Sequence, residues 1–157
     1  MFTKKFNRRV LREKSLQVLY AFEMNKDGLR VLTEGILADV PTDSDKEFAR
    51  SLITKVIANR TILDDKIKER VDNWEMNRIA LIDKILLRIG IAELLFFPDI
   101  PPKVSINEVI EIAKDYSTGN SGKFINGILD AILNDLKDSG NLTKAGRGLV
   151  EETIPKK

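Results

Sequence analysis

Apolar residues recur at helical spacing along most of the chain. In the opening segment Leu11, Val18 and Phe22 fall on one face, with the period of an amphipathic α-helix. The same spacing predicts further helices over about 29–38, 44–72, 75–96, 105–116 and 124–139. No segment shows the convincing alternation of a β-strand, and the stripe runs unbroken through the hairpin-like pair Asn126-Gly127. The pattern therefore predicts a single all-α bundle of six to seven helices.

Short polar residues mark where these helices are expected to begin. The candidates are two capping boxes, Ser44 with Glu47 and Ser105 with Glu108, and the pair Thr61 with Asp64. That pair can cap a break near Arg60, so the third segment is either one long helix or two. Residues 117–122 are a loop by composition, and Gly140 is the expected C-cap of the last helix. We therefore expect a domain over residues 1–140 and, where the apolar period ends, a loose tail over 141–157.

The composition excludes many kinds of active site. The chain has 157 residues, enough for one domain, and contains neither cysteine nor histidine. Disulfides, thiolate metal sites, cysteine nucleophiles and serine–histidine triads are therefore excluded, and no cofactor is expected. The segment 79–97 carries four charged residues, too many for a membrane span. We expect a cytoplasmic protein without a membrane partner.

Positive charge is concentrated at the start of the chain. Residues 1–14 hold six basic residues and one acidic residue, although the whole chain has a net charge of only +2. Arg8, Arg9 and Arg12 follow one stripe of the first helix, where guanidinium groups can bond phosphates in a bidentate manner. The pattern indicates a polyanionic partner. The basic residues are explained equally well by a surface helix start that only improves solubility.

The segment from Gly119 to Lys123 offers a second candidate site. Its glycine spacing differs from that of a nucleotide-binding P-loop, and Phe124 follows the lysine, so we reject a triphosphatase. A helix start with free N–H groups and a lysine can still bind an anion, although an ordinary helix linker is the commoner explanation. Phe124 could stack on an unpaired base, although core packing is again commoner. The acidic residues have the spacing of helix surfaces, which argues against two-carboxylate hydrolysis.

Four blocks of sequence occur in a recognisable order. They are Arg8–Glu13 with Leu16–Tyr20, then Leu86–Leu94, Asp99–Glu108 and Lys123–Asp130. Together they span about Asn7 to Leu136, and their order and spacing resemble the NusB family of bacterial transcription antitermination factors. Each block alone is weak, whereas four in register are specific.

The resemblance implies an all-helical bundle of two subdomains without catalytic activity. It implies binding of boxA-type single-stranded RNA together with NusE, a small-subunit ribosomal protein, and entry into the RNA polymerase elongation complex, notably on ribosomal RNA operons. The implied RNA contacts are Arg8, Arg9, Arg12, Arg88, Asn120, Ser121, Lys123 and Phe124. The implied NusE contacts are Tyr20 and Asp83. The family often has an acid at position 120 and a larger residue at position 122, so the polar base contacts of this segment are less certain than the phosphate contacts.

Two other functions are weighed against this one. The same helical domain opens ribosomal RNA cytosine methyltransferases, but the chain has no cysteine for that chemistry. A structural helical module with a solubilising arm is the third reading, and the apolar faces leave a homodimer open. Under the leading reading, we expect the opening arginines and the helix start at Lys123 to lie on one surface and to bind one RNA strand.

Overall fold

The computed structural model describes residues 7–149. Within this range the chain forms eight α-helices and one 3-10 helix, and no strand occurs. The elements are α1 (Arg8–Asn25), α2 (Leu29–Ile36), α3 (Asp43–Ala58), α4 (Arg60–Lys68), α5 (Asn73–Arg78), α6 (Leu81–Phe96), α7 (Pro102–Tyr116), α8 (Gly119–Ser139) and η1 (Gly146–Leu149). The expected all-α fold is confirmed, with one helix more than the upper estimate. None of the described helices is long and apolar enough to cross a membrane.

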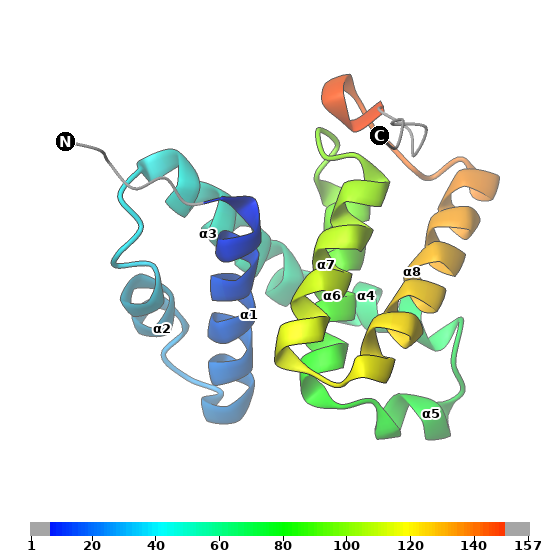
Figure 1. The fold of residues 1–157 in the computed structure, drawn as a ribbon, viewed down its shortest axis with the longest axis horizontal. Helices are drawn as coiled ribbons and strands as arrows, with labels where there is room; N and C mark the ends of the chain where they lie inside the picture. Colours follow the sequence, from blue (N-terminus) through cyan, green and yellow to red (C-terminus); the bar gives the residue numbers. More distant parts are fainter. Residues whose placement is uncertain (1–6, 150–157) are drawn as a thin grey trace. The chain divides into compact units, whose positions relative to one another are not determined.

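The first of two compact units ends at Ala58. In it, α1 packs against both α2 and α3 (Figure 1). Asn7 caps α1 by accepting a hydrogen bond from the Val10 N–H at 2.9 Å, and Lys26 ends the helix with a φ of 57°. Of the stripe of apolar residues predicted for α1, Leu11 and Val18 are fully covered and Phe22 is partly covered.

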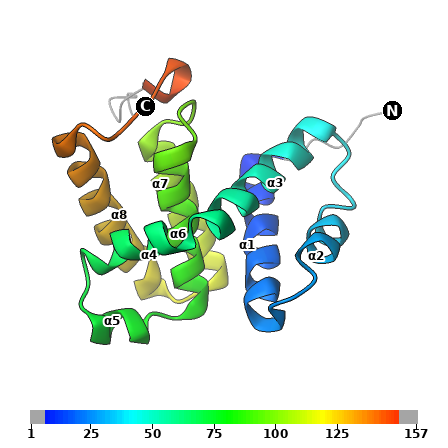
Figure 2. The ribbon, with the colours of Figure 1, turned by 180° about the vertical axis from the view of Figure 1, so that it is seen from behind.

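The second unit begins at Asn59. In it, α6, α7 and α8 lie side by side, and α4 packs across α6 and α8 (Figure 2). Gly90 permits the close approach of α6 to α8, because a Cβ at this position would lie 2.8 Å from Leu129 Cδ1. Eleven of the sixteen residues of α6 are buried, so this helix forms the centre of the unit.

Two of the predicted helix starts are wrong. Helix α3 begins at Asp43, and Thr42 rather than Ser44 accepts the capping hydrogen bond from the Asp45 N–H. Helix α7 begins at Pro102, because proline has the φ of a first helical turn and needs no N–H partner there. Ser105 therefore lies inside α7, where its hydroxyl donates to Glu93 Oε1 at 2.6 Å in the core.

The long apolar stripes are divided twice. Of the two alternatives for the third segment, the structure has two helices, divided just before Arg60. Asn59 rather than Thr61 takes the N-cap position of the second one. The single helix expected over 75–96 is wrong, because Ile79 and Ala80 have extended ψ angles of 128° and 146°. The short helix α5 before this break has its own capping box, formed by Asp72 and Glu75.

The last helix and the segment after it also differ from expectation. Helix α8 begins at Gly119, so only residues 117 and 118 remain of the expected six-residue loop. The helix runs through Asn126-Gly127 and ends at Gly140, as predicted. Residues 141–149, expected to be loose, return to the end of α6, where the Ala145 N–H donates to the Pro98 carbonyl at 2.9 Å. Residues 150–157 of the predicted tail lie outside the described residues.

Candidate functional site

The basic residues of α1 divide into exposed and covered groups. Arg8 and Arg9 are exposed, whereas Arg12 is only 2% exposed. The guanidinium carbons of Arg8 and Arg12 lie 3.8 and 5.6 Å from the centre of the Phe48 ring, within the range of cation–π attraction. Lys14 bonds the Ile36 carbonyl and pairs with an acid of the α2–α3 connection. Helical spacing placed all three arginines on one stripe and did not show that Arg12 is buried.

Tyr20 lies on the same helix and is 38% exposed. Met24, one turn later, is 63% exposed. The predicted partner residue Tyr20 is thus accessible, next to an apolar side chain that the sequence analysis did not single out.

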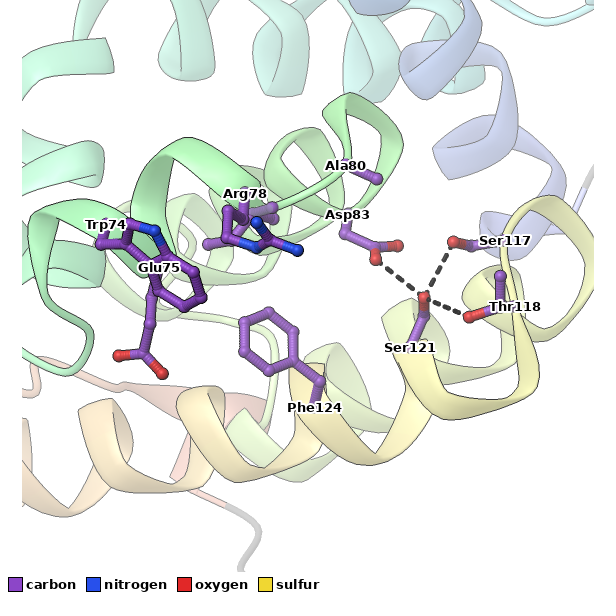
Figure 3. A pocket seen from close by; sticks show the side chains of 10 residues that line it. Trp74, Glu75, Arg78, Ala80, Asp83, Ser117, Thr118, Ser121 and Phe124 are labelled. Atoms are coloured by element: carbon purple, nitrogen blue, oxygen red, sulfur yellow. Dashed lines mark hydrogen bonds between the residues drawn. The ribbon is translucent and has the colours of Figure 1, made fainter.

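A pocket of about 360 Å³ lies within the second unit (Figure 3). Its walls come from α5, the start of α6, the α7–α8 connection and the first turns of α8. The lining residues are Trp74, Glu75, Arg78, Ile79, Ala80, Asp83, Ser117, Thr118, Ser121 and Phe124. The volume falls at the lower end of the ~300–1,000 Å³ typical of small-ligand sites. The pocket contains three residues predicted separately as contacts, namely Asp83, Ser121 and Phe124.

A hydroxyl network holds one side of the Asp83 carboxylate. Ser121 Oγ donates to Asp83 Oδ2 at 2.7 Å and lies 2.8 Å from Ser117 Oγ and 3.1 Å from Thr118 Oγ1 (Figure 3). Because the Ser121 proton is directed at the carboxylate, the other two hydroxyls donate to Ser121. Asp83 is 7% exposed, and its buried Oδ1 has no hydrogen-bond partner among the described residues. Buried carboxylate oxygens are usually hydrogen-bonded, so Oδ1 is an exception among the described residues.

Aromatic side chains form the wider part of the pocket. Phe124 is 37% exposed and points toward α5, where Trp74 is 66% exposed (Figure 3). The Arg78 guanidinium carbon lies 4.6 Å from the centre of the Trp74 ring. The sequence analysis singled out neither Trp74 nor Arg78. Their spacing of four residues was a signal for a surface pair on one helix face.

The first turn of α8 carries the remaining predicted contacts. Asn120 and Lys123 are exposed, whereas Ser121 is 5% exposed within the hydroxyl network. Thr118 occupies the N-cap position without a side-chain capping bond. The Ser121 N–H donates to the Thr118 carbonyl at 3.1 Å, so the N–H groups of Gly119 and Asn120 are the ones left for an anion. At Gly122, a Cβ would lie 3.5 Å from Ile110, an ordinary contact distance. The glycine is therefore not required by crowding.

Arg88 lies in a different environment from the other predicted RNA contacts. It is 4% exposed, and its Nε donates to Asp64 Oδ1 at 2.8 Å while Nη2 donates to Asp64 Oδ2 at 3.2 Å. This bidentate pair joins α6 to α4. Among residues 7–149, no group of acidic side chains is arranged to hold a metal ion.

The fold and this pocket define an all-α protein with a pocket that is partly walled by aromatic side chains. The NusB family matches residues 9–134. Similar curated proteins include the transcription antitermination protein NusB of Chloroherpeton thalassium, 52% identical over 92% of this chain and 70% of that protein, and that of Salinibacter ruber, 47% identical over 92% and 91%. The chain therefore belongs to the NusB family.

Solved structures support the same fold. NusB of T. maritima superposes with a TM-score of 0.78 at 40% identity, covering 84% of this chain and 94% of that one. A structure of the antitermination factors NusB and NusE in complex with double-stranded RNA has a TM-score of 0.74 at 23% identity, with coverage of 82% and 96%. At that identity the second comparison supports the helical fold alone.

Proposed function

We propose that this chain is an RNA-binding transcription antitermination factor that acts in the cytoplasm without catalysis. It binds boxA-type single-stranded RNA together with NusE and joins the RNA polymerase elongation complex, notably on ribosomal RNA operons. Family membership supports antitermination, since the similar curated proteins are transcription antitermination proteins. The structural observation that carries RNA binding is the exposure of Arg8 and Arg9 at the start of α1, where guanidinium groups can reach phosphates.

The proposed RNA contacts fall into two groups. Arg8, Arg9 and Lys123 are exposed cations for the phosphates, and phosphate contacts position a strand without reading its sequence. Phe124, Ser121 and Asn120 belong to the segment proposed to contact bases. Arg12 and Arg88 were predicted as further contacts, but both are buried. We therefore propose that Arg12 supports the α1 surface through Phe48 and that Arg88 joins α4 to α6.

The proposed NusE contact is Tyr20. It is accessible, and a tyrosine combines apolar area with a hydroxyl, which suits protein interfaces. The resemblance also implies a NusE contact at Asp83, but only 7% of this side chain is exposed. A homodimer through the apolar surface of Tyr20 and Met24 would compete with NusE, and light scattering with and without NusE distinguishes the two assemblies.

A fluorescence anisotropy titration tests the proposed function. The labelled probes are a boxA RNA and a scrambled RNA of the same composition, each measured with and without NusE. We expect tighter binding to boxA and a further gain with NusE. Equal affinity for both RNAs in both conditions would instead support a helical module whose basic helix start only improves solubility.

A further inference from the structure

We propose that Lys144 is an acylation site, whose neutral amino group accepts an acyl group from an acyl phosphate. The inference does not depend on RNA binding, because Lys144 lies in the segment after α8 and is not among the proposed RNA contacts. It rests on how the amine of Lys144 is bonded and on the charges that surround it.

Two backbone carbonyls at the end of α6 bond the Lys144 amine. Nζ donates to the Glu93 oxygen at 3.0 Å and to the Phe97 oxygen at 2.8 Å. A charged lysine has three N–H donors, and no carboxylate of the described residues lies within ion-pair distance of this Nζ. The two carbonyls therefore match the two N–H groups of a neutral amine, whose lone pair is directed away from them.

The surroundings of Lys144 favour the neutral amine. Burial lowers the pKa of Lys144 from its ordinary 10.5 to about 8, and the negative charges of Glu93 and Asp99 oppose this shift without cancelling it. The Glu93 carboxylate on α6 already accepts the hydroxyl of Ser105, and Asp99 lies in the α6–α7 connection. Near neutral pH, a larger fraction of Lys144 than of an ordinary lysine is therefore neutral, and the neutral form is the nucleophile.

A small phosphate-bearing reagent can approach this amine. Lys144 is only partly buried, and the two residues after it, Ala145 and Gly146, are small and exposed. Arg147 is exposed on the same segment, and a guanidinium group bonds phosphate oxygens in a bidentate manner. The segment that carries the amine thus also carries a cation for the phosphate of the acyl donor.

The reaction is an acyl transfer. The Nζ lone pair attacks the acyl carbon, a C–N bond forms, and the C–O bond to the phosphate breaks. Phosphate leaves with the bonding electrons, and the proton lost from nitrogen passes to solvent. The product is a neutral amide with one N–H, so one of the two carbonyls loses its donor. Acylation therefore loosens the attachment of residues 141–149 to the end of α6.

The experiment treats the full chain with acetyl phosphate and measures the rate of acetylation at each lysine by peptide mass spectrometry. Lys68, exposed on α4, is the reference within the same sample. At about pH 7.5 we expect Lys144 to react about tenfold faster than Lys68, because more of it is neutral. The rate at Lys144 should level off above about pH 8, whereas the rate at Lys68 keeps rising toward about pH 10.5. We also expect the acetylated chain to exchange the Ala145 amide hydrogen, which bonds the Pro98 carbonyl, faster than the unmodified chain.

The variant Gly148→Ala tests whether the carbonyl contacts cause the reactivity. A Cβ at Gly148 would collide with the Pro98 carbonyl oxygen and displace the segment, whereas a Cβ at Gly127 would have nothing within 4 Å. We expect Gly148→Ala to give Lys144 the rate and pH profile of Lys68, and the control Gly127→Ala to leave both unchanged. The pH profile of the wild type needs no variant, so it decides the question even if Gly148→Ala unfolds.

Arg147→Gln tests the choice of acyl donor. We expect this variant to slow acetylation of Lys144 by acetyl phosphate about threefold, as for one exposed ion pair. Acetylation by N-acetoxysuccinimide, which carries no phosphate, should keep its rate. Equal effects on the two reagents would overturn the assignment of acyl phosphates.

Two further outcomes would overturn the inference. If Lys144 and Lys68 react at the same rate and with the same pH profile, Lys144 is an ordinary lysine. If Lys144 reacts more slowly than Lys68 at every pH, the two carbonyls protect the amine instead of activating it. Neither outcome affects the proposed function, which the RNA titration tests separately.

Discussion

Arg88 and Asp64 form a bidentate ion pair that joins α6 to α4. The two bonds measure 2.8 and 3.2 Å, and the side chains are 5% and 18% exposed. Arg60, one turn before Asp64, adds a longer contact of 3.9 Å from the surface. Because both bonds of this guanidinium go to Asp64, Arg88 joins two helices of the second unit.

Removing the acid of this pair should destabilise the fold. Asp64→Ala leaves the buried Arg88 guanidinium without its carboxylate, and the loss of one partner of a buried pair costs about 3–5 kcal/mol. Asp65→Ala is the control, because Asp65 is exposed and its loss should cost less than ~0.5 kcal/mol. Urea unfolding followed by circular dichroism measures both. Equal midpoints for the two variants would show that the pair contributes little.

The exposed arginines of α1 should determine the salt dependence of RNA binding. Arg9→Glu should weaken binding and lower the slope of log affinity against log salt by about one unit, as expected for one lost phosphate contact. Arg30→Glu makes the same charge change at an exposed position of α2 and should leave the slope unchanged. Identical slopes for both variants would mean that net charge, rather than a contact at Arg9, governs binding.

The expectation that one RNA strand contacts both Arg9 and Lys123 makes a separate prediction. If Arg9 and Lys123 contact the same bound strand, Arg9→Glu combined with Lys123→Glu should reduce the salt slope by about two units. The measurement is the same titration at four or more salt concentrations. A double variant with the slope of either single variant would show that only one of the two sites contacts the RNA.

The apolar pattern predicted most helices, but it did not predict where they begin. The burial of Leu11 and Val18 agrees with the periodicity, because helix position is determined by which face is covered. The starts depend on neighbours that compete locally. Thr42 caps α3 upstream of Ser44, and α7 already begins at Pro102, upstream of Ser105. The Ser105 hydroxyl instead donates to Glu93 inside the core.

The candidate site was predictable only in part. Phe124 and Lys123 could be singled out, because a lysine and an aromatic residue at a helix start are chemically distinctive. No sequence signal indicated that Asp83 lines a pocket, since an acid in the first turn of a helix usually lies at the surface. That arrangement depends on the break at Ile79 and Ala80, which turns α5 toward α8 and which apolar spacing does not reveal.

Gly148 should be far less tolerant of substitution than Gly127. A Cβ at Gly148 would lie 1.8 Å from the Pro98 carbonyl oxygen, whereas a Cβ at Gly127 would have nothing within 4 Å. Gly148→Ala should therefore displace residues 141–149 and destabilise the unit by roughly 1–3 kcal/mol. Gly127→Ala, inside α8, should stabilise it by about 0.5–1 kcal/mol. Thermal unfolding measures both effects. If Gly148→Ala does not lower the Tm, residues 141–149 do not pack against Pro98.

Lys144 should make stability rise with pH above neutrality. Its amino group donates to the Glu93 and Phe97 carbonyls at 3.0 and 2.8 Å. Burial lowers the pKa of Lys144 from its ordinary 10.5 to about 8, although the negative charges of Glu93 and Asp99 oppose the shift. Between about pH 8 and 10.5, the unfolded chain therefore binds more protons at this residue than the folded chain does.

The sign of the effect follows from this difference in bound protons. Folded Lys144 loses its proton first as the pH rises, so its contribution to stability increases from about pH 8 toward 10.5 and is smallest at neutral pH. Lys144→Met removes the titration, and the gain of the wild type over this variant should increase between pH 7.5 and 9.5. Urea midpoints measured at both pH values test this. Lys114→Met, at an exposed position of α7, is the control. A constant difference between wild type and Lys144→Met would show that Lys144 has an ordinary pKa in the folded protein.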